Sequence, residues 1–379
     1  MTWIWENRNW PDFTWSKDRV NSICREIFHN IGVISGKIGF FEKNENAQAE
    51  LDSLLKSILT SSAIEGESLN AFSVRSSLAK RLKIKVDKFP TTARTEGLAD
   101  LQFDIIHNLD KKFSKKRLLL WHTMLFPSGE DWKIPVGKFR GNTPMQVVSG
   151  RVDNPRVHFE APPQKKIKTE VQLLLDWFND TKADATYDPF VRAGIAHLWF
   201  VTIHPFEDGN GRLARALSEL ALAQYHSASS TLYSLSSNIL DQRKEYYSIL
   251  EKTQRGGLDI TEWLIWFLKI LNQSIQDSIL KIDKTLFKIR FWQYFRDSQF
   301  LPEQRKILNA MFDSESSQFD KGISAKQYQK IAKVSKATAT RHLAELVELG
   351  CIEKLSAGGR STAYRLVKLS FNQNRKTYS

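Results

Sequence analysis

The sequence has only two cysteines, Cys24 and Cys351, in 379 residues. Two cysteines are too few for a disulfide framework or a cysteine-rich zinc site, and such a chain suits a reducing compartment. There is no run of eighteen or more apolar residues, and the N-terminus has neither a basic region nor an apolar one. These absences argue against a signal peptide and a membrane span, so we expect a cytoplasmic protein with no membrane contact.

Charge is unevenly distributed along the chain. The formal net charge is +13, and the segment from Lys321 to the C-terminus holds 12 Lys or Arg residues against 3 Glu. A local excess of this kind points to a module that faces an anionic partner, and nucleic acid is the first candidate for that partner.

Helical periodicity dominates most of the chain. From about residue 48, Leu51, Leu54 and Ile58 recur at helical spacing, and Gly66 is a natural stop. The same pattern predicts further helices at about 93–108, 115–126, 165–179, 188–203, 211–226, 242–253 and 260–296. The chain is therefore expected to be mainly α-helical.

Residues 137–163 follow a different pattern. Apolar residues alternate from Met145 to Val147 and again from Val157 to Phe159, with turn-forming residues between the two runs. This alternation predicts a β-hairpin.

The basic C-terminal segment predicts three short helices at 301–312, 324–334 and 335–350, followed by two strands around Gly358 and Gly359. Such an order is typical of a winged helix-turn-helix domain, which binds DNA or serves only for protein contact or dimerisation. The third helix is expected to bury Ala339, Leu343, Leu346 and Val347 and to present Lys336, Thr338, Thr340 and Arg341, with Arg360 and Arg365 of the wing near phosphates.

The stretch HPFEDGNGRLAR, residues 204–215, concentrates polar chemistry behind an apolar segment. Gly209 and Gly211 let the backbone turn at the start of a helix, where unpaired amides and the helix dipole favour an anion. Arg212 and Arg215 share one face of that helix, and two guanidiniums suit a di- or triphosphate.

Two further residues of this stretch point to catalysis. Asp208 is a hard oxygen ligand, which beside phosphates makes sense with Mg²⁺ between them. His204 is the residue of the stretch that can act as a base at neutral pH. The combination indicates nucleotide-phosphate chemistry with a general base.

The same stretch matches, at every defined position, the signature of Fic-domain proteins, His-Pro-Phe-x-Asp/Glu-Gly-Asn-Gly-Arg-x-x-Arg. The segment WIWENRNWPDFTW resembles the Trp-rich N-terminal segment of one bacterial branch of that family, and MQVVSG and VHFEAPP resemble its flap. The resemblance covers nearly the whole chain. It implies a Fic helical bundle with a β-hairpin flap, to which a C-terminal winged helix is a common addition.

The resemblance implies an activity, the transfer of AMP from ATP to a Ser, Thr or Tyr hydroxyl of a target protein. His204 then takes the proton of the attacking hydroxyl, and Asp208 holds the Mg²⁺ that bridges the α- and β-phosphates. The other implied contacts are the amides of Gly209, Asn210 and Gly211 as an anion cradle, the Asn210 side chain at the α-phosphate, Arg212 at the β-phosphate and Arg215 at the γ-phosphate.

Two surfaces beyond this stretch are implied as well. Tyr246 and Tyr247 resemble an aromatic pair near the family's nucleobase pocket, which Gln254 would also line, although an ordinary amphipathic helix carries such tyrosines too. The flap strand containing Val147, Val148 and Ser149 is expected to hold the target segment through β-strand addition.

An inhibitory motif is implied far upstream. SSAIEG matches the family pattern Ser/Thr-x-x-x-Glu-Gly/Asn, with Ser61, Glu65 and Gly66 at the defined positions. Glu65 is expected to form a salt bridge with Arg215 in the place of the γ-phosphate, so that the enzyme inhibits itself. The same glutamate can position water for AMP removal in some relatives.

Several alternatives remain open at this point. The Fic fold also serves phosphotransferases and AMP-removing enzymes, and a nucleotide-sensing transcriptional regulator would use DNA as partner; a homodimer is open too. The expected domains are 1–92 with the inhibitory helix at about 48–66, a catalytic core at 93–275 with the flap at 137–163, a helical linker at 276–302, a winged helix at 303–370 and a tail at 371–379.

Overall fold

The computed structural model describes residues 2–39, 43–128, 132–151, 154–184, 186–226, 231–313, 322–355 and 362–367, without the side chains of 43–46, 150, 151, 154 and 155. The chain divides into two compact units, residues 1–280 and 281–379. The boundary falls within one continuous helix, α12 (Thr261–Tyr294), where the sequence predicted a separate linker from residue 276.

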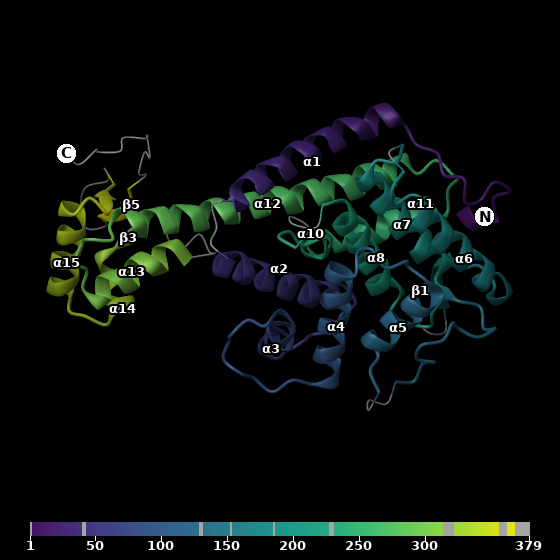
Figure 1. The fold of residues 1–379 in the computed structure, drawn as a ribbon, viewed down its shortest axis with the longest axis horizontal. Helices are drawn as coiled ribbons and strands as arrows, with labels where there is room; N and C mark the ends of the chain where they lie inside the picture. Colours follow the sequence, from purple (N-terminus) through teal and green to yellow (C-terminus); the bar gives the residue numbers. More distant parts are fainter. Residues whose placement is uncertain are drawn as a thin grey trace. The chain divides into compact units, whose positions relative to one another are not determined.

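The first unit consists of helices and a β-hairpin (Figure 1). Each of the seven ranges predicted as a helix from periodicity alone is present, with both ends within two residues of expectation, whereas α2 begins five residues before its expected start. In chain order the elements are η1 (Ile4–Glu6), α1 (Lys17–Ile38), α2 (Lys43–Ile64), α3 (Ala71–Leu82), α4 (Ala93–His107), α5 (Lys115–Leu125), β1 (Gln146–Arg151), β2 (Asn154–Glu160), α6 (Gln164–Asp180), α7 (Pro189–Ile203), α8 (Asn210–Tyr225), α10 (Leu235–Asp241), α11 (Arg243–Gln254) and the first part of α12.

Helix α7 is the core of this unit. Asp188 caps its N-terminus by accepting hydrogen bonds from the amides of Phe190 and Val191, and Pro189 occupies the first turn. Every residue from Phe190 to Ile203 is buried, as expected for a helix that is apolar on all sides. Helix α8 packs along α7, so the turn between them is mounted on the most deeply buried helix.

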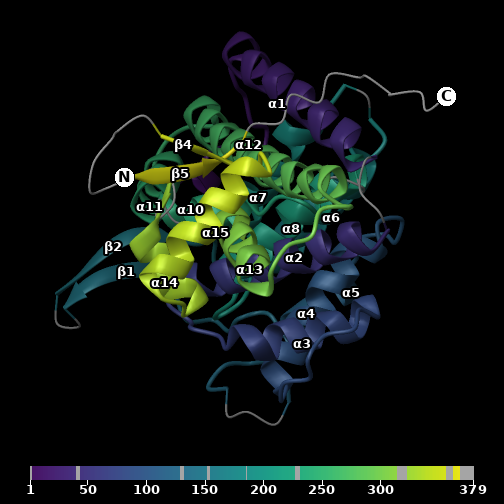
Figure 2. The ribbon, with the colours of Figure 1, turned by 90° about the vertical axis from the view of Figure 1, so that its left-hand side faces the viewer.

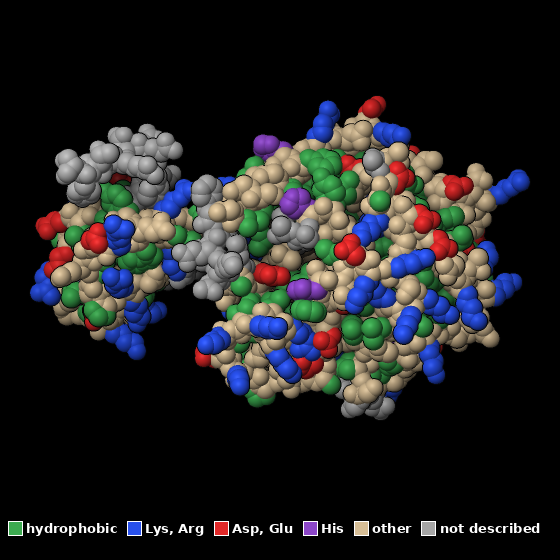
Figure 3. Space-filling model, in the orientation of Figure 1, with side chains coloured by type: hydrophobic (Ala, Val, Ile, Leu, Met, Phe, Trp, Pro, Cys, Tyr) green, Lys and Arg blue, Asp and Glu red, His purple; other side chains and the backbone are tan. Residues whose placement is uncertain are grey.

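Two further contacts complete the frame. Helix α1 runs beside α12 (Figure 1), and between them the side-chain Nδ2 of Asn30 donates to Asn272 Oδ1 at 2.8 Å. Strands β1 and β2 pair antiparallel and extend outward from the helices of this unit (Figure 2). On the face drawn in Figure 3, Lys and Arg side chains of the first unit lie among Asp and Glu side chains, so no large patch of one sign forms there.

The described residues of the second unit form the end of α12, three more helices and a three-stranded antiparallel sheet of order β3-β5-β4. The three predicted helices are present, and the sheet has one strand more than predicted, β3. The elements after α12 are α13 (Pro302–Asp313), β3 (Ile323–Ser324), α14 (Ala325–Ala332), α15 (Lys336–Glu348), β4 (Ile352–Lys354) and β5 (Ala363–Leu366).

Helix α15 differs from its predicted faces in one position. Ala339, Leu343 and Leu346 are buried as expected, but Val347 is 37% exposed. His342 takes the remaining place in the core, where its Nδ1 lies 2.9 Å from the Tyr328 hydroxyl. A histidine can face the core because a buried hydroxyl satisfies its ring nitrogen.

The outward face of α15 is polar. Lys336, Thr340 and Arg341 are exposed and Thr338 is half-buried. In strand β5, Arg365 is exposed and its Nε donates to Glu353, whereas Arg360, Gly358 and Gly359 lie outside the described residues. Among the described helices of the whole chain, none combines the length and the apolar character needed to cross a membrane.

Candidate active site

The site is built on the turn between α7 and α8. His204 ends α7 in the left-handed region, with φ of 49°, a conformation that is uncommon for a residue with a side chain. Gly209 is the N-cap residue just before α8 and has φ of 83°. A Cβ at this position would lie 2.8 Å from the Phe126 ring. Only glycine fits both the backbone angle and the close approach of Phe126, so the turn can enter α8 here.

Two side chains that the sequence did not single out hold this turn in place. The Arg140 guanidinium donates to the carbonyl of His204 at 2.7 Å and also to that of Pro162. The His122 ring stacks on Phe206 at a centroid distance of 4.1 Å and donates from Nε2 to the carbonyl of Asp208 at 3.3 Å. Both side chains come from segments 60 or more residues before the turn, and no local pattern marks them.

His204 is oriented as a base. Its Nδ1 lies 3.1 Å from the carbonyl oxygen of Val201, which can only accept, so Nδ1 carries the proton and Nε2 keeps its lone pair. Burial lowers the pKa of His204 to about 4, assisted by Arg140, against the opposing effects of Val201 O, Glu65 and Asp208. The imidazole is therefore neutral at physiological pH, which is the state that accepts a proton.

The side chain of Asn210 is hydrogen-bonded to the backbone of the turn itself. Its Oδ1 accepts from the Phe206 amide at 3.0 Å and its Nδ2 donates to the Phe206 carbonyl at 2.8 Å, in a side chain that is 2% exposed. Both ends of the amide group thus close the turn on itself. The contact of this side chain with the α-phosphate stays a prediction.

Two acidic side chains lie at the predicted anion cradle. The backbone amide of Gly209 donates to Asp208 Oδ1 at 2.6 Å, so this amide already has an acceptor within the protein. At Gly211, an added Cβ would lie 2.3 Å from Glu65 Oε1. A carboxylate therefore rests against the first turn of α8, where the helix dipole favours negative charge.

Arg215 is held by the segment predicted to be inhibitory. Its side chain is 1% exposed, its Nε donates to Ser61 Oγ at 2.9 Å, and its Nη2 donates to the Ser61 carbonyl and to Glu65 Oε1 at 2.8 Å. Burial acts to lower the pKa of Arg215, but the charge and hydrogen bond of Glu65, together with Tyr246 and Tyr247, raise it overall. The contact between Glu65 and Arg215 predicted from the sequence is present, and Gly66 ends the segment with φ of 82°.

Arg212 contacts two carboxylates. Its Nη1 donates to Glu67 Oε2 at 2.9 Å, and its Nη2 lies 3.3 Å from Asp208 Oδ2. Its Nε is buried with no hydrogen-bond partner in the described part of the chain. The sequence interpretation missed Glu67, although a second acid two residues after Glu65 was a visible signal.

The two tyrosines predicted at a nucleobase pocket differ in exposure. Tyr246 is 1% exposed, and its hydroxyl lies 2.9 Å from His197 Nε2 in the core. Gln254 is 4% exposed and donates to Thr202 Oγ1 at 3.2 Å. Both side chains are thus buried, whereas Tyr247 is 39% exposed and its hydroxyl donates to Glu65 Oε2 at 3.3 Å. The nucleobase pocket stays a prediction.

Comparison with known families gives this turn its context. Residues 112–222, which contain α5, the hairpin, α6, α7 and nearly all of α8, match the model of the Fic/DOC family. The chain contains a Fic domain. Residues 3–84 match a domain of unknown function, DUF4172.

Known relatives match the Fic domain over part of their length. Protein adenylyltransferase fic-1 of Caenorhabditis elegans is 32% identical over 133 residues, which are 34% of this chain and 24% of that protein. A probable protein adenylyltransferase of Aquifex aeolicus is 28% identical over 121 residues, 32% of this chain and 34% of its own. The chain thus spans about a quarter to a third of these relatives.

A solved structure extends the likeness to the fold of the whole chain. A Fic family protein from Desulfovibrio desulfuricans has a TM-score of 0.53 at 20% identity, over 96% of this chain and 99% of that one. This likeness confirms the mainly helical Fic fold that the sequence predicted.

The hairpin of the Fic domain presents one apolar strand to the outside. Val147 and Val148 of β1 are 37% and 50% exposed, and Ser149 is exposed too. The hairpin is fixed to α11 on its other strand, because His158 Nδ1 lies 2.6 Å from Glu251 Oε2 and Arg255 donates to the carbonyls of Val157 and His158. Ser149 Oγ contacts the same imidazole at its Nε2, at 2.5 Å.

The Trp-rich N-terminal segment packs on the base of this hairpin. The Trp3 ring meets Phe159 of β2 edge-on, with centroids 5.4 Å apart, and Trp5 Nε1 donates to the Glu160 carbonyl at 2.7 Å. Trp10 Nε1 donates to Glu170 of α6 at 2.8 Å. Large half-buried rings thus pin this segment to the Fic domain.

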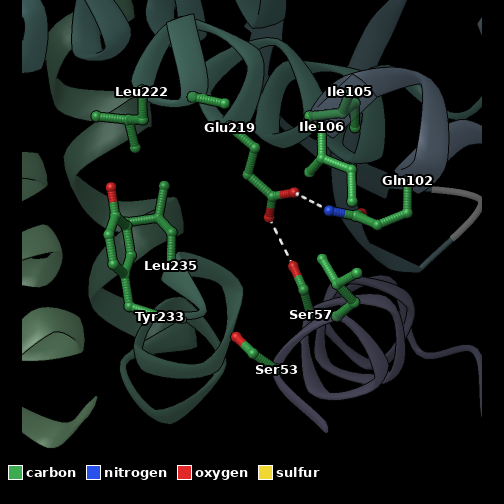
Figure 4. A pocket seen from close by; sticks show the side chains of 11 residues that line it. Ser53, Ser57, Gln102, Ile105, Ile106, Glu219, Leu222, Tyr233 and Leu235 are labelled. Atoms are coloured by element: carbon green, nitrogen blue, oxygen red, sulfur yellow. Dashed lines mark hydrogen bonds between the residues drawn. The ribbon is translucent and has the colours of Figure 1, made fainter. Parts of the chain in front are cut away.

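A buried carboxyl group joins α8 of the Fic domain to α2. Glu219 lies one turn after Arg215 and accepts from Ser57 Oγ at 2.6 Å and from Gln102 Nε2 at 3.0 Å (Figure 4). Apolar side chains and Tyr233 line the small cavity around it. Burial raises the pKa of Glu219, although Ser57, Gln102 and Arg215 act against that rise.

This raised pKa predicts a pH-dependent effect on stability. Below the ordinary pKa of 4.5, Glu219 is protonated in both folded and unfolded chains; as pH rises, the unfolded chain ionises first and folding loses stability. Glu219→Gln, which cannot ionise, is therefore expected to raise Tm by roughly 2 °C at pH 8. Thermal unfolding followed by circular dichroism should show this gain shrinking toward pH 5. A variant no more stable than wild type at pH 8 would contradict the prediction.

Proposed function

We propose that this protein transfers AMP from ATP to a hydroxyl side chain of a target protein. The observation that carries the proposal is the turn from His204 to Arg215, in which a neutral imidazole with a free Nε2 stands next to a helix N-terminus and two buried arginines. Relatives named protein adenylyltransferases match the chain over the segment that contains this turn.

In the proposed reaction the residues of this chain bind, orient and move one proton. His204 Nε2 takes the proton of the target hydroxyl, whose oxygen forms a bond to the α-phosphorus as the bond to pyrophosphate breaks. Arg212 pairs with the β-phosphate and Arg215 with the γ-phosphate, where charge is neutralised. The exposed edge of β1 at Val147, Val148 and Ser149 holds the target by main-chain pairing.

Asp208 is the residue that would hold Mg²⁺, which supplies charge neutralisation at the phosphates. Its side chain is 58% exposed, and the described residues contain no group of three or more His, Cys, Asp or Glu side chains that could bind a metal. This donor set fits Mg²⁺, because Mg²⁺ in such sites is held by one or two carboxylates together with substrate phosphates and water.

We also propose that the resting protein is inhibited by Glu65. Its carboxylate lies against Gly211 and on Arg215, which is the place that the γ-phosphate takes in the proposed complex. An anion already bound there opposes productive ATP binding by charge and by occupancy. Inhibition would end when the Glu65 side chain moves off Arg215. Its 29% exposure means that it already borders solvent, into which it can move.

Mass spectrometry of the Glu65→Gly protein after incubation with ATP and a cell lysate tests the activity. Adenylyl groups on hydroxyl side chains are the expected modification. Phosphoryl groups would instead establish a phosphotransferase. Release of AMP from modified protein by wild type, lost in Glu65→Gly, would show that Glu65 positions water for removal.

The exposed basic face of α15 supports a second candidate function. Lys336, Thr340 and Arg341 face outward on a segment rich in Lys and Arg, so we propose winged-helix binding to DNA. This arrangement would suit a cytoplasmic, nucleotide-sensing regulator, as a monomer or a homodimer. A promoter footprint that changes with ATP supports it, and absence of any specific footprint rejects it.

A further inference from the structure

Glu67 projects from the same turn as Glu65 but binds a different arginine. The amides of Glu65 and Glu67 both donate to the Ser62 carbonyl, at 3.1 and 3.0 Å, so Gly66 places two carboxylates on one compact turn. One carboxylate goes to Arg215 and the other to Arg212. Two acids from one turn thus contact both proposed phosphate-binding arginines.

The Glu67 carboxylate is bound by a fork. Arg94 Nε donates to its Oε1 at 2.7 Å and Arg94 Nη2 to its Oε2 at 2.6 Å, while Arg212 shares Oε2 at 2.9 Å. Burial acts to raise the pKa of Glu67, but the hydrogen bonds and charge of Arg94, with the charge of Arg212, lower it overall. Glu67 is therefore an anion between two cations at neutral pH.

The surroundings make Glu67 a fixed group. Arg94 and Arg212 are each 7% exposed at the side chain, and both guanidiniums lie near the Phe126 ring, at 5.6 and 5.0 Å. If Glu67 withdrew, two buried cations would be left without their shared anion. Glu65 differs, because among the described residues the side chains that hydrogen-bond to its carboxylate are those of Arg215 and Tyr247 alone.

We propose that Glu67, braced by Arg94, is a positioning residue that fixes Arg212 for the β-phosphate and remains bound when Glu65 leaves. Glu67 uses one Nη1 donor of Arg212, while Nε has no partner among the described residues and Nη2 reaches toward Asp208. A guanidinium has five donors, so a phosphate can be bound while Glu67 stays in place. The two acids of this turn therefore act in opposite directions: Glu65 inhibits and Glu67 supports. This inference rests on the proposed function.

Nucleotide affinity provides the test, because AMP lacks the β-phosphate that Arg212 would bind. In the Glu65→Gly background with Mg²⁺, we expect Glu67→Gln to weaken ADP binding about tenfold in isothermal titration calorimetry while AMP binding changes less than twofold. Arg94→Lys keeps the charge but loses the fork, so it should weaken ADP in the same direction. If Glu67→Gln does not fold by circular dichroism, Arg94→Lys gives the deciding measurement. With Arg212→Ala already present, adding Glu67→Gln should have no further effect on ADP.

The outcomes separate this inference from the proposed function. If the Glu65→Gly parent binds ADP and the folded Glu67→Gln and Arg94→Lys variants bind it equally well, the positioning role is wrong and the proposed function stands. An equal loss for AMP and ADP would show a merely structural role and also overturn the inference. A parent that binds neither ADP nor ATP would overturn the proposed function and the positioning role with it.

Discussion

Replacing Glu65 by glycine is expected to raise AMP incorporation from labelled ATP by 10- to 100-fold over wild type. The Arg215 guanidinium, 1% exposed, would lose the carboxylate that now competes with the γ-phosphate, and its buried charge would favour an incoming phosphate. A rate increase of this size corresponds to about 1.4–2.8 kcal/mol. This is less than the cost of breaking a fully buried ion pair, because the Glu65 side chain is 29% exposed and water weakens the pair. The measurement is the initial rate of label transfer to protein.

Two controls make this result specific. Glu65→Gln keeps the shape and removes the charge, so it should also activate, by a smaller factor. Asp52→Asn changes another acid of α2, an exposed one that pairs with half-buried Arg75, and should leave the rate unchanged. Equal rates for wild type and a well-folded Glu65→Gly protein would show that the Glu65–Arg215 contact does not inhibit.

Replacing His204 by alanine in the activated Glu65→Gly protein is expected to reduce the rate by roughly 10²–10⁴-fold, the usual contribution of a general base. ATP affinity should remain within a few fold, because the arginines that bind the phosphates are untouched. His29→Ala, an exposed histidine on α1, is the matched control and should keep full activity. Full activity of the His204 variant would remove His204 from the mechanism.

The pH profile gives an independent check on the same residue. Because the pKa of His204 is lowered to about 4, the base stays neutral and the rate should be constant from pH 8 down to about pH 5.5. The sign follows from protonation: only below the lowered pKa does the imidazole lose its free lone pair. Loss of the Glu65 carboxylate lowers that pKa further, since Glu65 acts to raise it. A fall in rate centred near pH 6.5 would contradict a lowered pKa of His204.

Contiguous features of the sequence were sufficient for much of the fold. Apolar spacing placed α7 and α8 within two residues of their ends, because a helix period repeats over many neighbouring residues. Residue 347 shows the limit: its apolar side chain fits the face of α15, but the second unit buries His342 instead, since Tyr328 supplies a hydrogen bond there.

The candidate site divides in the same way. The sequence by itself determined the turn from His204 to Arg215, because that turn rests on a dense local motif. The pairing of Glu65 with Arg215 was implied by the family resemblance of SSAIEG. Only the tertiary structure decided that Asn210 bonds inward to Phe206, that Tyr246 is buried on His197, and that Glu67 joins Arg94 to Arg212. The partners of Tyr246 and Glu67 lie in distant segments that only packing brings together. The side chain of Asn210 can bond either to solvent or to the nearby backbone. The spacing of residues along the chain records neither outcome.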